Sequence, residues 1–328
     1  AARRPGTTFI AEVKNSAKST RLIPFEFSTT QTYVLEFSDQ IIRFYKDNGQ
    51  IQSSGSPYEI SSPYLEAELF DIKFAQSADI MYITHPSHKT RTLSRTGHTS
   101  WTLAEVDFTN GPFLDSNITT TTLTPASSGT GTGVNITASA VTGINGGSGF
   151  LATDVGRQIH FNSGYATITS RTSTTVVVVT ITTAFTNTNA ITNWFLGAFS
   201  DTTGHPACVT FFEQRLVFAA TINNPQTVYL SKSGDYENMD ANIGGTVADD
   251  DAIIYTIASN QVNAIRFLAS TRTLIIGTAG GEFAVTGGGD NNAITPTNIM
   301  IKKQSNHGAA NVDGISVGNA TLFLQRAK

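Results

Sequence analysis

A short strand, a polar turn and a second, strongly apolar strand recur along the chain. Each occurrence ends in a run of β-branched, aromatic or aliphatic residues, which is typical of a β-hairpin. The pattern is found at residues 27–37, 74–83, 211–219, 267–276 and 315–324. Apolar residues alternate or stand in short blocks and do not recur at helical spacing. We therefore expect an all-β chain in which less than about a tenth of the residues are helical.

Most of these hairpins start about fifty residues apart, and such a period predicts repeated structural units. Units of roughly 40–50 residues with four strands each are typical of β-propeller blades. The second unit fits this description, with strand candidates at 69–75, 80–84, 90–94 and 101–106. The pattern therefore predicts an all-β, β-propeller-like platform.

The interval between the second and third hairpins is too long for one unit and indicates an insertion. Between 113 and 200 the only charged residues are Asp115, Asp154, Arg157 and Arg171. This segment is rich in Thr, Ser, Gly and Asn, with β-branched strand candidates at 118–124 and 176–183 and glycine-rich turns at 129–133 and 143–149. We predict propeller-like blades at 1–112, an inserted small β-barrel or β-sandwich domain at 113–200, and further, truncated blades at 201–328.

The chain carries few charges, and this limits what it can bind. Asp, Glu, Lys and Arg make up 14% of the 328 residues, and the formal net charge is −4. Binding to a phosphate backbone needs clustered Lys and Arg, so a nucleic-acid-binding protein is disfavoured, although DNA could slide past a weakly acidic wall. Cys208 lies in an apolar run, which predicts a buried thiol. No apolar run reaches the length of about 18 residues that a membrane span requires.

Several residue patterns could carry chemistry, and each has a plainer structural interpretation. His85 and His88 have the spacing of two metal ligands on a helix, but they flank a turn with a proline, so no zinc site is predicted. The acidic run 249–251 lacks the alternating spacing of a calcium loop, and a solvated loop is expected. The glycine-rich run 277–281 lies between two strands, which predicts a hairpin turn and not a phosphate loop. The run 287–290 has the composition of a calcium-binding β-roll but occurs only once.

Carboxylates and aromatic residues leave two further classes of function open. A glycosidase needs two carboxylates facing each other across a cleft, and possible partners are Glu66, Glu68, Asp71, Glu213 and Asp235. Two of these, Glu213 and Asp235, are expected instead to hold turns or to pair with Arg215 and Lys232. Exposed aromatic side chains could stack on sugars, and the candidates are Tyr58, Tyr64, Trp101, Trp194 and Tyr236. The prediction is a protein that is not an enzyme and has no catalytic, cofactor-binding or metal site, with a host-surface glycan-binding module or a polysaccharide depolymerase as alternatives.

A set of sequence blocks outside the insertion resembles one protein family. The blocks are RRPGTTF at 3–9, RLIPFEF at 21–27, IRFY at 42–45, LSR at 93–95 with Trp101, FFEQRLVF at 211–218, SKSGDY at 231–236 and FLQR at 323–326. Together they resemble the tail nozzle, or tail tubular protein B-like, proteins of bacteriophages. The insertion resembles a small β-domain named after the first catalytic cysteine half-domain of ubiquitin-activating enzymes, and that name describes a fold and not an activity.

This resemblance implies a structural virion protein, made in the bacterial cytoplasm and built into the phage tail. Nozzle proteins of this kind form a ring, commonly a hexamer, which is part of the DNA exit tube below the portal and adaptor and carries the tail fibres. The implied partners are copies of the chain itself, adaptor and portal-proximal proteins, tail fibres and double-stranded DNA in transit, without a cofactor. Since the chain lacks an initiator Met and ends inside a predicted strand at 322–328, we expect it to be part of a longer protein.

Overall fold

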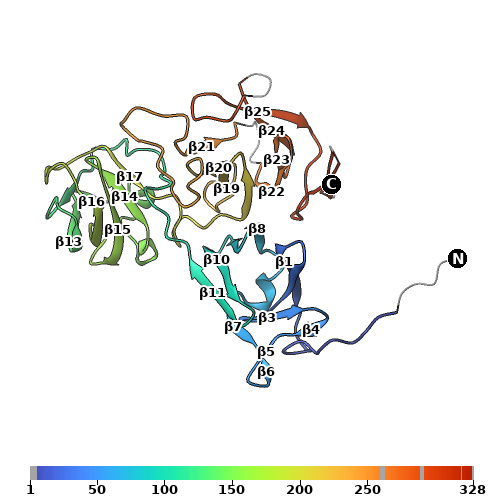
Figure 1. Cartoon of the computed structure of the whole chain (residues 1–328). Coiled ribbons are helices and arrows are strands. Elements are labelled where there is room, and N and C mark those ends of the chain that lie inside the picture. Colours follow the sequence, from blue (N-terminus) through green and yellow to red (C-terminus); the bar gives the residue numbers. More distant parts are fainter. Residues whose placement is uncertain (1–5, 259–262, 289–291, 319, 327–328) are drawn as a thin grey trace. The chain divides into compact units, whose positions relative to one another are not determined.

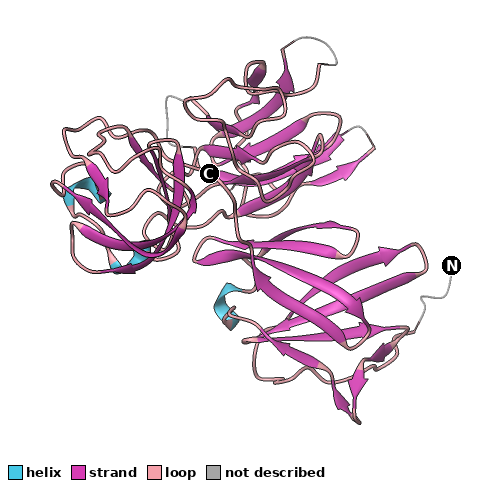
Figure 2. Ribbon diagram, turned by 60° about the vertical axis from the view of Figure 1, so that its left-hand side comes forward, coloured by secondary structure: helices cyan, strands magenta, loops and turns pink. Residues whose placement is uncertain are grey.

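The computed structural model describes residues 6–258, 263–288, 292–318 and 320–326, so Arg3, Arg4 and residues 289–290 lie outside the described part. The described residues form 27 strands, and their helices are the short 3-10 turns η1 (Glu66–Glu68), η2 (Asn145–Gly147) and η3 (Ala152–Asp154) (Figure 2). The predicted all-β fold is confirmed. In the described ranges no helix is long and apolar enough to cross a membrane. The chain divides into two compact units, 1–85 with 90–105 and 86–89 with 106–328.

The first unit contains two antiparallel meanders. One consists of β1 (Arg21–Ser28), β2 (Gln31–Ser38), β3 (Ile41–Lys46) and β4 (Gly49–Gln50), with β7 (Glu59–Ser61) also pairing with β3. The other consists of β8 (Lys73–Ser77), β9 (Ile80–His85), β10 (His88–Gly97) and β11 (Ser100–Glu105). A small hairpin of β5 (Gln52–Ser53) and β6 (Ser56–Pro57) projects from the first meander (Figure 1). The predicted strand at 69–75 begins later, at Lys73, because η1 and a turn occupy the preceding residues.

Trp101 holds the core of the first unit together. Its ring lies 4.8 Å from the ring of Phe25, 5.2 Å from that of Tyr33 and 4.5 Å from that of Phe44. Trp101 is on β11, whereas the other three rings come from β1, β2 and β3, so the two meanders share one apolar core. Apolar and polar residues alternate along these strands, and residues two apart point to the same face, so the apolar side chains of both meanders meet in this core.

The segment 113–200 forms a six-stranded antiparallel sheet in the order β12-β13-β16-β15-β14-β17. Its strands are β12 (Leu123–Pro125), β13 (Gly131–Ala138), β14 (Gln158–Phe161), β15 (Gly164–Arg171), β16 (Val176–Thr183) and β17 (Trp194–Leu196). Leu123 at one edge bridges to Ile191, which lies three residues before the start of the strand at the other edge. The sheet therefore curls around an apolar core of its own.

Of the two strands predicted for this segment, one is confirmed and one is wrong. The one at 176–183 is confirmed as β16, in which Val177, Val179 and Ile181 point into the core. The one at 118–124 is wrong, because a strand forms only from Leu123 onward. The preceding residues are drawn into a loop by Asn117, whose side chain accepts a hydrogen bond from the backbone N–H of Thr119. Such side-chain bonds compete with strand pairing.

The rest of the second unit again consists of antiparallel meanders. One contains β18 (Cys208–Phe212), β19 (Arg215–Ala219), β20 (Thr227–Leu230) and β21 (Ile253–Thr256), and the next contains β22 (Ile265–Ser270), β23 (Leu274–Thr278), β24 (Gly281–Gly287) and β25 (Ile299–Ser305). These two sheets share one core, which includes the buried Cys208. A final hairpin consists of β26 (Ile315–Val317) and β27 (Ala320–Leu322).

All five hairpins predicted from the sequence are present, as β1–β2, β8–β9, β18–β19, β22–β23 and β26–β27. Four-stranded meanders are the unit from which propeller blades are built, so the fold is all-β and propeller-like. The division into parts at 1–112, 113–200 and 201–328 stays a prediction.

Candidate functional site

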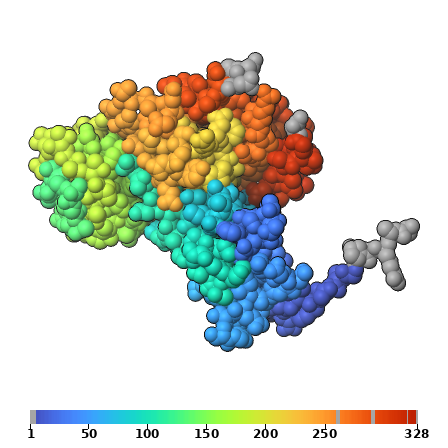
Figure 3. All heavy atoms as spheres, viewed as in Figure 1, coloured from blue at the N-terminus to red at the C-terminus, as the bar shows by residue number. Residues whose placement is uncertain are grey.

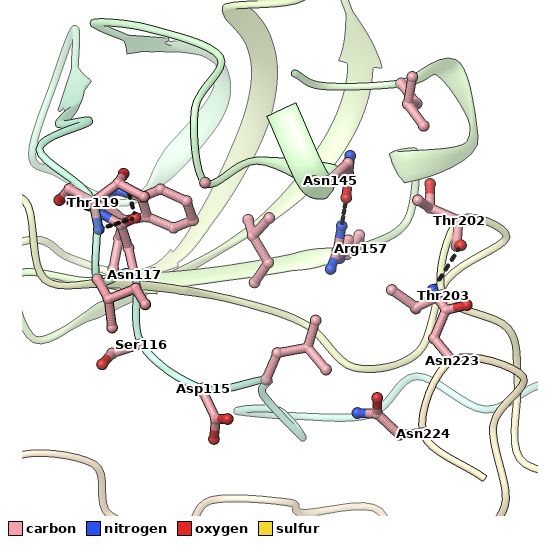
Figure 4. A pocket seen from close by; sticks show the side chains of 17 residues that line it. Asp115, Ser116, Asn117, Thr119, Asn145, Arg157, Thr202, Thr203, Asn223 and Asn224 are labelled. Atoms are coloured by element: carbon pink, nitrogen blue, oxygen red, sulfur yellow. Dashed lines mark hydrogen bonds between the residues drawn. The ribbon is translucent and has the colours of Figure 1, made fainter. Parts of the chain in front are cut away.

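A polar pocket of about 530 Å³ opens in the second unit, where the loops of segment 113–200 face the turns at 200–204 and 221–224 (Figure 4). Its volume lies within the range of roughly 300–1,000 Å³ that ligand pockets have. Its polar lining consists of Asp115, Ser116, Asn117, Thr119, Asn145, Arg157, Thr202, Thr203, Asn223 and Asn224. Hydroxyl and amide groups dominate this lining, as the composition of the chain leads one to expect.

Asn117 builds one wall of the pocket. Its Nδ2 donates to the carbonyl oxygens of Thr119, Thr121 and Thr192 at 2.9–3.0 Å, and its Oδ1 accepts from the N–H and hydroxyl of Thr119. The loop also leaves no room beside Gly143, because a Cβ there would lie 2.6 Å from the Oδ1 of Asn117. The side-chain amide of Asn117 is thus fully engaged in shaping the loop.

A buried network forms the opposite wall. Nη1 of Arg157 lies 2.9 Å from Oδ1 of Asp154 and 2.8 Å from Oδ1 of Asn145, and its Nε donates to the carbonyl of Gly197 at 2.7 Å. Oδ2 of Asp154 accepts from the amide of Asn145 and from the backbone N–H of Leu151, each at 2.7 Å. Burial lowers the pKa of Arg157, and the neighbouring Asp154 carboxylate opposes this shift. The charge of Arg157 is therefore matched inside the wall.

The third wall is a turn stabilised by hydroxyl groups. The Ser200 and Thr203 hydroxyls lie 2.8 Å apart, and the Thr203 hydroxyl donates to the carbonyl of Ala198. Nδ2 of Asn223 donates to the carbonyl of Thr202 at 3.4 Å, and that bond joins this turn to the turn at 221–224. This wall is therefore held by hydrogen bonds between neutral groups, without an ion pair.

Four polar residues of the lining keep hydrogen-bonding capacity for a ligand. Asp115 is exposed, and neither it nor Ser116 makes a side-chain hydrogen bond to the described residues. Asn223 and Asn224 each use Nδ2, the latter toward the Tyr229 hydroxyl at 3.4 Å, and their Oδ1 atoms accept no hydrogen bond within the described ranges. The pocket therefore offers more hydrogen-bond acceptors than donors, the donors being the Ser116 hydroxyl and the second N–H of each of the two Nδ2 atoms. Asp115 adds one negative charge that no described cation of the lining compensates.

A second candidate site is the outer face of the hairpin β26–β27, at the surface of its unit and coloured red in Figure 3. Paired residues of a hairpin point to the same side, and the pairs here are Ile315 with Leu322 and Val317 with Ala320. Ile315, Val317 and Leu322 are 67%, 54% and 60% exposed, and Leu324, which follows β27, is 61% exposed. Phe323, the residue after β27, packs on β22, and its ring lies 5.8 Å from that of Phe267.

The histidines considered as metal ligands lie at the β9–β10 turn. His85 ends β9 and is buried, and His88 begins β10. Within the first unit, the carboxylate of Glu68 lies within 4.8 Å of the His85 imidazole, a proximity that no pattern in the sequence indicated. His98, in the turn after β10, contacts the hydroxyl of Tyr33 at 2.8 Å.

The acidic run 249–251 was expected to be a solvated loop, but it is held to the neighbouring segments by hydrogen bonds and an ion pair. Arg215 donates to backbone carbonyls of all three of its residues, and Asp251 is buried with its carboxylate 2.8 Å from Nζ of Lys232. Of the two residues expected to hold turns or to pair with Arg215 and Lys232, Asp235 holds its own turn by accepting from the amide of Asn238, and Glu213 accepts from the backbone N–H of Ile294. The run 277–281 spans the turn between β23 and β24, as predicted.

The aromatic candidates are mostly structural. Tyr64 and Trp101 are buried in the first unit, beside the partly buried Tyr58. Trp194 is 2% exposed and donates through Nε1 to the carbonyl of Thr121, so it supports the pocket from behind. Tyr236 packs edge-on against Phe211. None of the five residues offers an open ring face in the pocket of the second unit.

No family model and no curated protein matches the chain. Among solved structures, a Phage phi92 endosialidase is similar over 91% of this chain and 47% of its own, at 12% identity and a TM-score of 0.26. A structure described as YCF48 bound to D1 peptide is similar over 87% and 93%, at 10% identity and a TM-score of 0.18. The chain thus spans about half the length of the endosialidase. Likenesses of this size carry no argument about function.

Proposed function

We propose that the chain is a structural protein of a bacteriophage tail, a nozzle-type subunit that assembles with copies of itself into part of the DNA exit tube and fibre platform. The sequence blocks that resemble the nozzle family support this proposal. Several of them, including RLIPFEF in β1 and FFEQRLVF in β18–β19, lie on the core strands of the meanders. The low charge of the chain suits the inner surface of a tube through which DNA moves, because few Lys and Arg side chains are available to bind its phosphates.

The observation that carries the proposal is the apolar outer face of β26–β27. Three large aliphatic side chains, Ile315, Val317 and Leu322, stand on the same face of the hairpin, each more than half exposed. Adjacent exposed apolar residues mark sites of protein–protein contact, and an uncovered hairpin edge is a template for pairing. A second copy of the chain is the proposed occupant. A contact between different surfaces of successive copies closes into a ring when the rotation permits.

Thiol labelling tests whether a second copy covers this face. The natural Cys208 is 2% exposed, so a maleimide reports almost only on an introduced cysteine. We expect Leu322→Cys to label rapidly in dilute solution and progressively more slowly as the protein concentration rises. Phe70→Cys is the matched control, because Phe70 is 64% exposed and lies in a turn of the other unit. Equal labelling of Leu322→Cys at all concentrations, with the control behaving in the same way, would contradict the proposal.

A further inference from the structure

The pocket of the second unit has a chemical character that selects among ligands, independently of how the chain assembles. Its unengaged groups are the Asp115 carboxylate, the Ser116 hydroxyl, and the Oδ1 atom and second Nδ2 N–H of both Asn223 and Asn224. Acceptor positions outnumber donor positions among these groups. A complementary ligand must therefore supply several hydrogen-bond donors at once.

The charges in the walls restrict the ligand further. Arg157 is 1% exposed and its charge is matched by Asp154, so it is not a free cation that would attract an anion. Asp115 is the uncompensated charge among the described lining residues, and it would repel a phosphate, sulfate or carboxylate brought close to it. A hard cation such as Ca²⁺ is also poorly served, because it prefers several carboxylate oxygens and the lining offers one exposed carboxylate.

A neutral saccharide meets these conditions. Its adjacent hydroxyl groups donate to a carboxylate and to amide oxygens, and hydrogen bonds to an ionised acceptor are the stronger kind. Its C–H faces need an apolar contact, which Ile118, 96% exposed at the pocket, and the half-buried Leu151 offer. The volume of about 530 Å³ accommodates a short oligosaccharide.

We infer that this pocket is a binding site for a neutral oligosaccharide, in which Asp115 accepts hydrogen bonds from two adjacent sugar hydroxyls. Asn223 and Asn224 accept from further hydroxyls across the pocket, and Asn117, Asn145 and the Asp154–Arg157 pair hold the walls in place. Figure 4 shows Asp115, Asn223 and Asn224 among the residues that line the pocket. The inference is one of binding and not of cleavage, because the described lining presents one exposed carboxylate where most glycosidases use two.

Ligand-observed NMR with defined sugars tests this inference. The neutral probes are maltotriose, triacetylchitotriose and lactose, and the anionic probe is 3′-sialyllactose, which adds one carboxylate-bearing sugar to lactose. We expect saturation transfer to at least one neutral probe and a clearly weaker signal for sialyllactose than for lactose. Absence of transfer to all three neutral probes, or equal transfer to lactose and sialyllactose, would overturn the inference.

Variants locate the site. Asp115→Ala is expected to weaken binding of the neutral probe by about tenfold or more, the effect of losing hydrogen bonds to an ionised acceptor. Ser116→Trp, which fills the pocket without removing a charge, is expected to abolish it. Asp249→Ala is the matched control, because Asp249 is an exposed carboxylate of the same unit outside the pocket. Unchanged binding in both pocket variants, or calcium binding that Asp115→Ala removes in the absence of sugar binding, would refute the assignment.

Discussion

Nη1 of Arg157 lies 2.9 Å from Oδ1 of Asp154, and the two side chains are 1% and 0% exposed. They are two of the four charged residues between 113 and 200. A third, Arg171, donates from Nε to the carbonyl of Phe150 at 2.6 Å. Three of the four charges therefore fix the loops of this segment, and the fourth, Asp115, faces the pocket.

Removing one partner of the buried pair should destabilise the segment strongly. Arg157→Met leaves the Asp154 carboxylate buried without its cation, and we expect the free energy of unfolding to fall by about 3–5 kcal/mol. Chemical denaturation followed by the fluorescence of Trp194, in a Trp101→Phe background, measures this change. Arg171→Met is the control, with an expected loss of about 1 kcal/mol for one hydrogen bond. The double variant Asp154→Leu with Arg157→Met should recover part of the loss, and a double variant less stable than the single one would contradict this explanation.

The close approach of the Asn117 side chain to Gly143 leads to a second prediction, about alanine substitutions at two glycines. Gly143 has φ +86° and a Cβ there would lie 2.6 Å from Oδ1 of Asn117, whereas Gly146, at φ +64°, has open space around it. Gly146→Ala should cost only the backbone penalty of a left-handed residue, about 1–2 kcal/mol. Gly143→Ala should cost more and should shift the NMR signals of the Asn117 side chain. An equal loss in the free energy of unfolding for the two variants would show that the loop accommodates a Cβ at Gly143, and it would contradict this prediction.

Burial of His160 makes the stability of the second unit depend on pH. The ring stacks on Tyr165 at 4.5 Å, and burial lowers its pKa below the ordinary value of 6.5 although Nδ1 contacts the Gly164 carbonyl. The unfolded chain then binds more protons than the folded one between the two pKa values, so stability is complete above pH 6.5 and falls as the pH drops toward the folded value. His205 is shifted in the same direction, also by burial.

The measurement is the free energy of unfolding at a series of pH values. His160→Phe should flatten part of its decline below pH 6.5, and combining it with His205→Asn should flatten it further. Substitution of His307, an exposed histidine near the C-terminal hairpin, is the control and should leave the decline unchanged. An undiminished decline in the double variant would show that other groups cause it.

The repeated hairpins were predictable because strand alternation and turn chemistry act over neighbouring residues. The strand at 118–124 was mispredicted for the opposite reason. Its Thr-rich sequence favours a strand, but three hydrogen bonds from Nδ2 of Asn117 hold the backbone in a loop. Propensity alone cannot anticipate a side chain that competes for the backbone.

The pocket was not predictable from sequence spacing. Asp115 and Asn224 line it together although more than a hundred residues separate them. Asparagine and threonine are so common in this chain that their presence at the site carried no signal. The role of Arg215 was missed likewise, since its partners are backbone carbonyls at 231 and 249–251, which have no side-chain signature.

The central claim, self-assembly through the apolar face of β26–β27, is tested most directly by the mass of the protein in solution. Light scattering over a wide concentration range should show growth from the monomer of 35.0 kDa to a defined closed oligomer. Leu322→Ser together with Ile315→Ser should keep the protein monomeric, whereas Phe70→Ser should assemble like the unaltered chain. A monomer at every concentration, or assembly unchanged in the hairpin variant, would contradict the account.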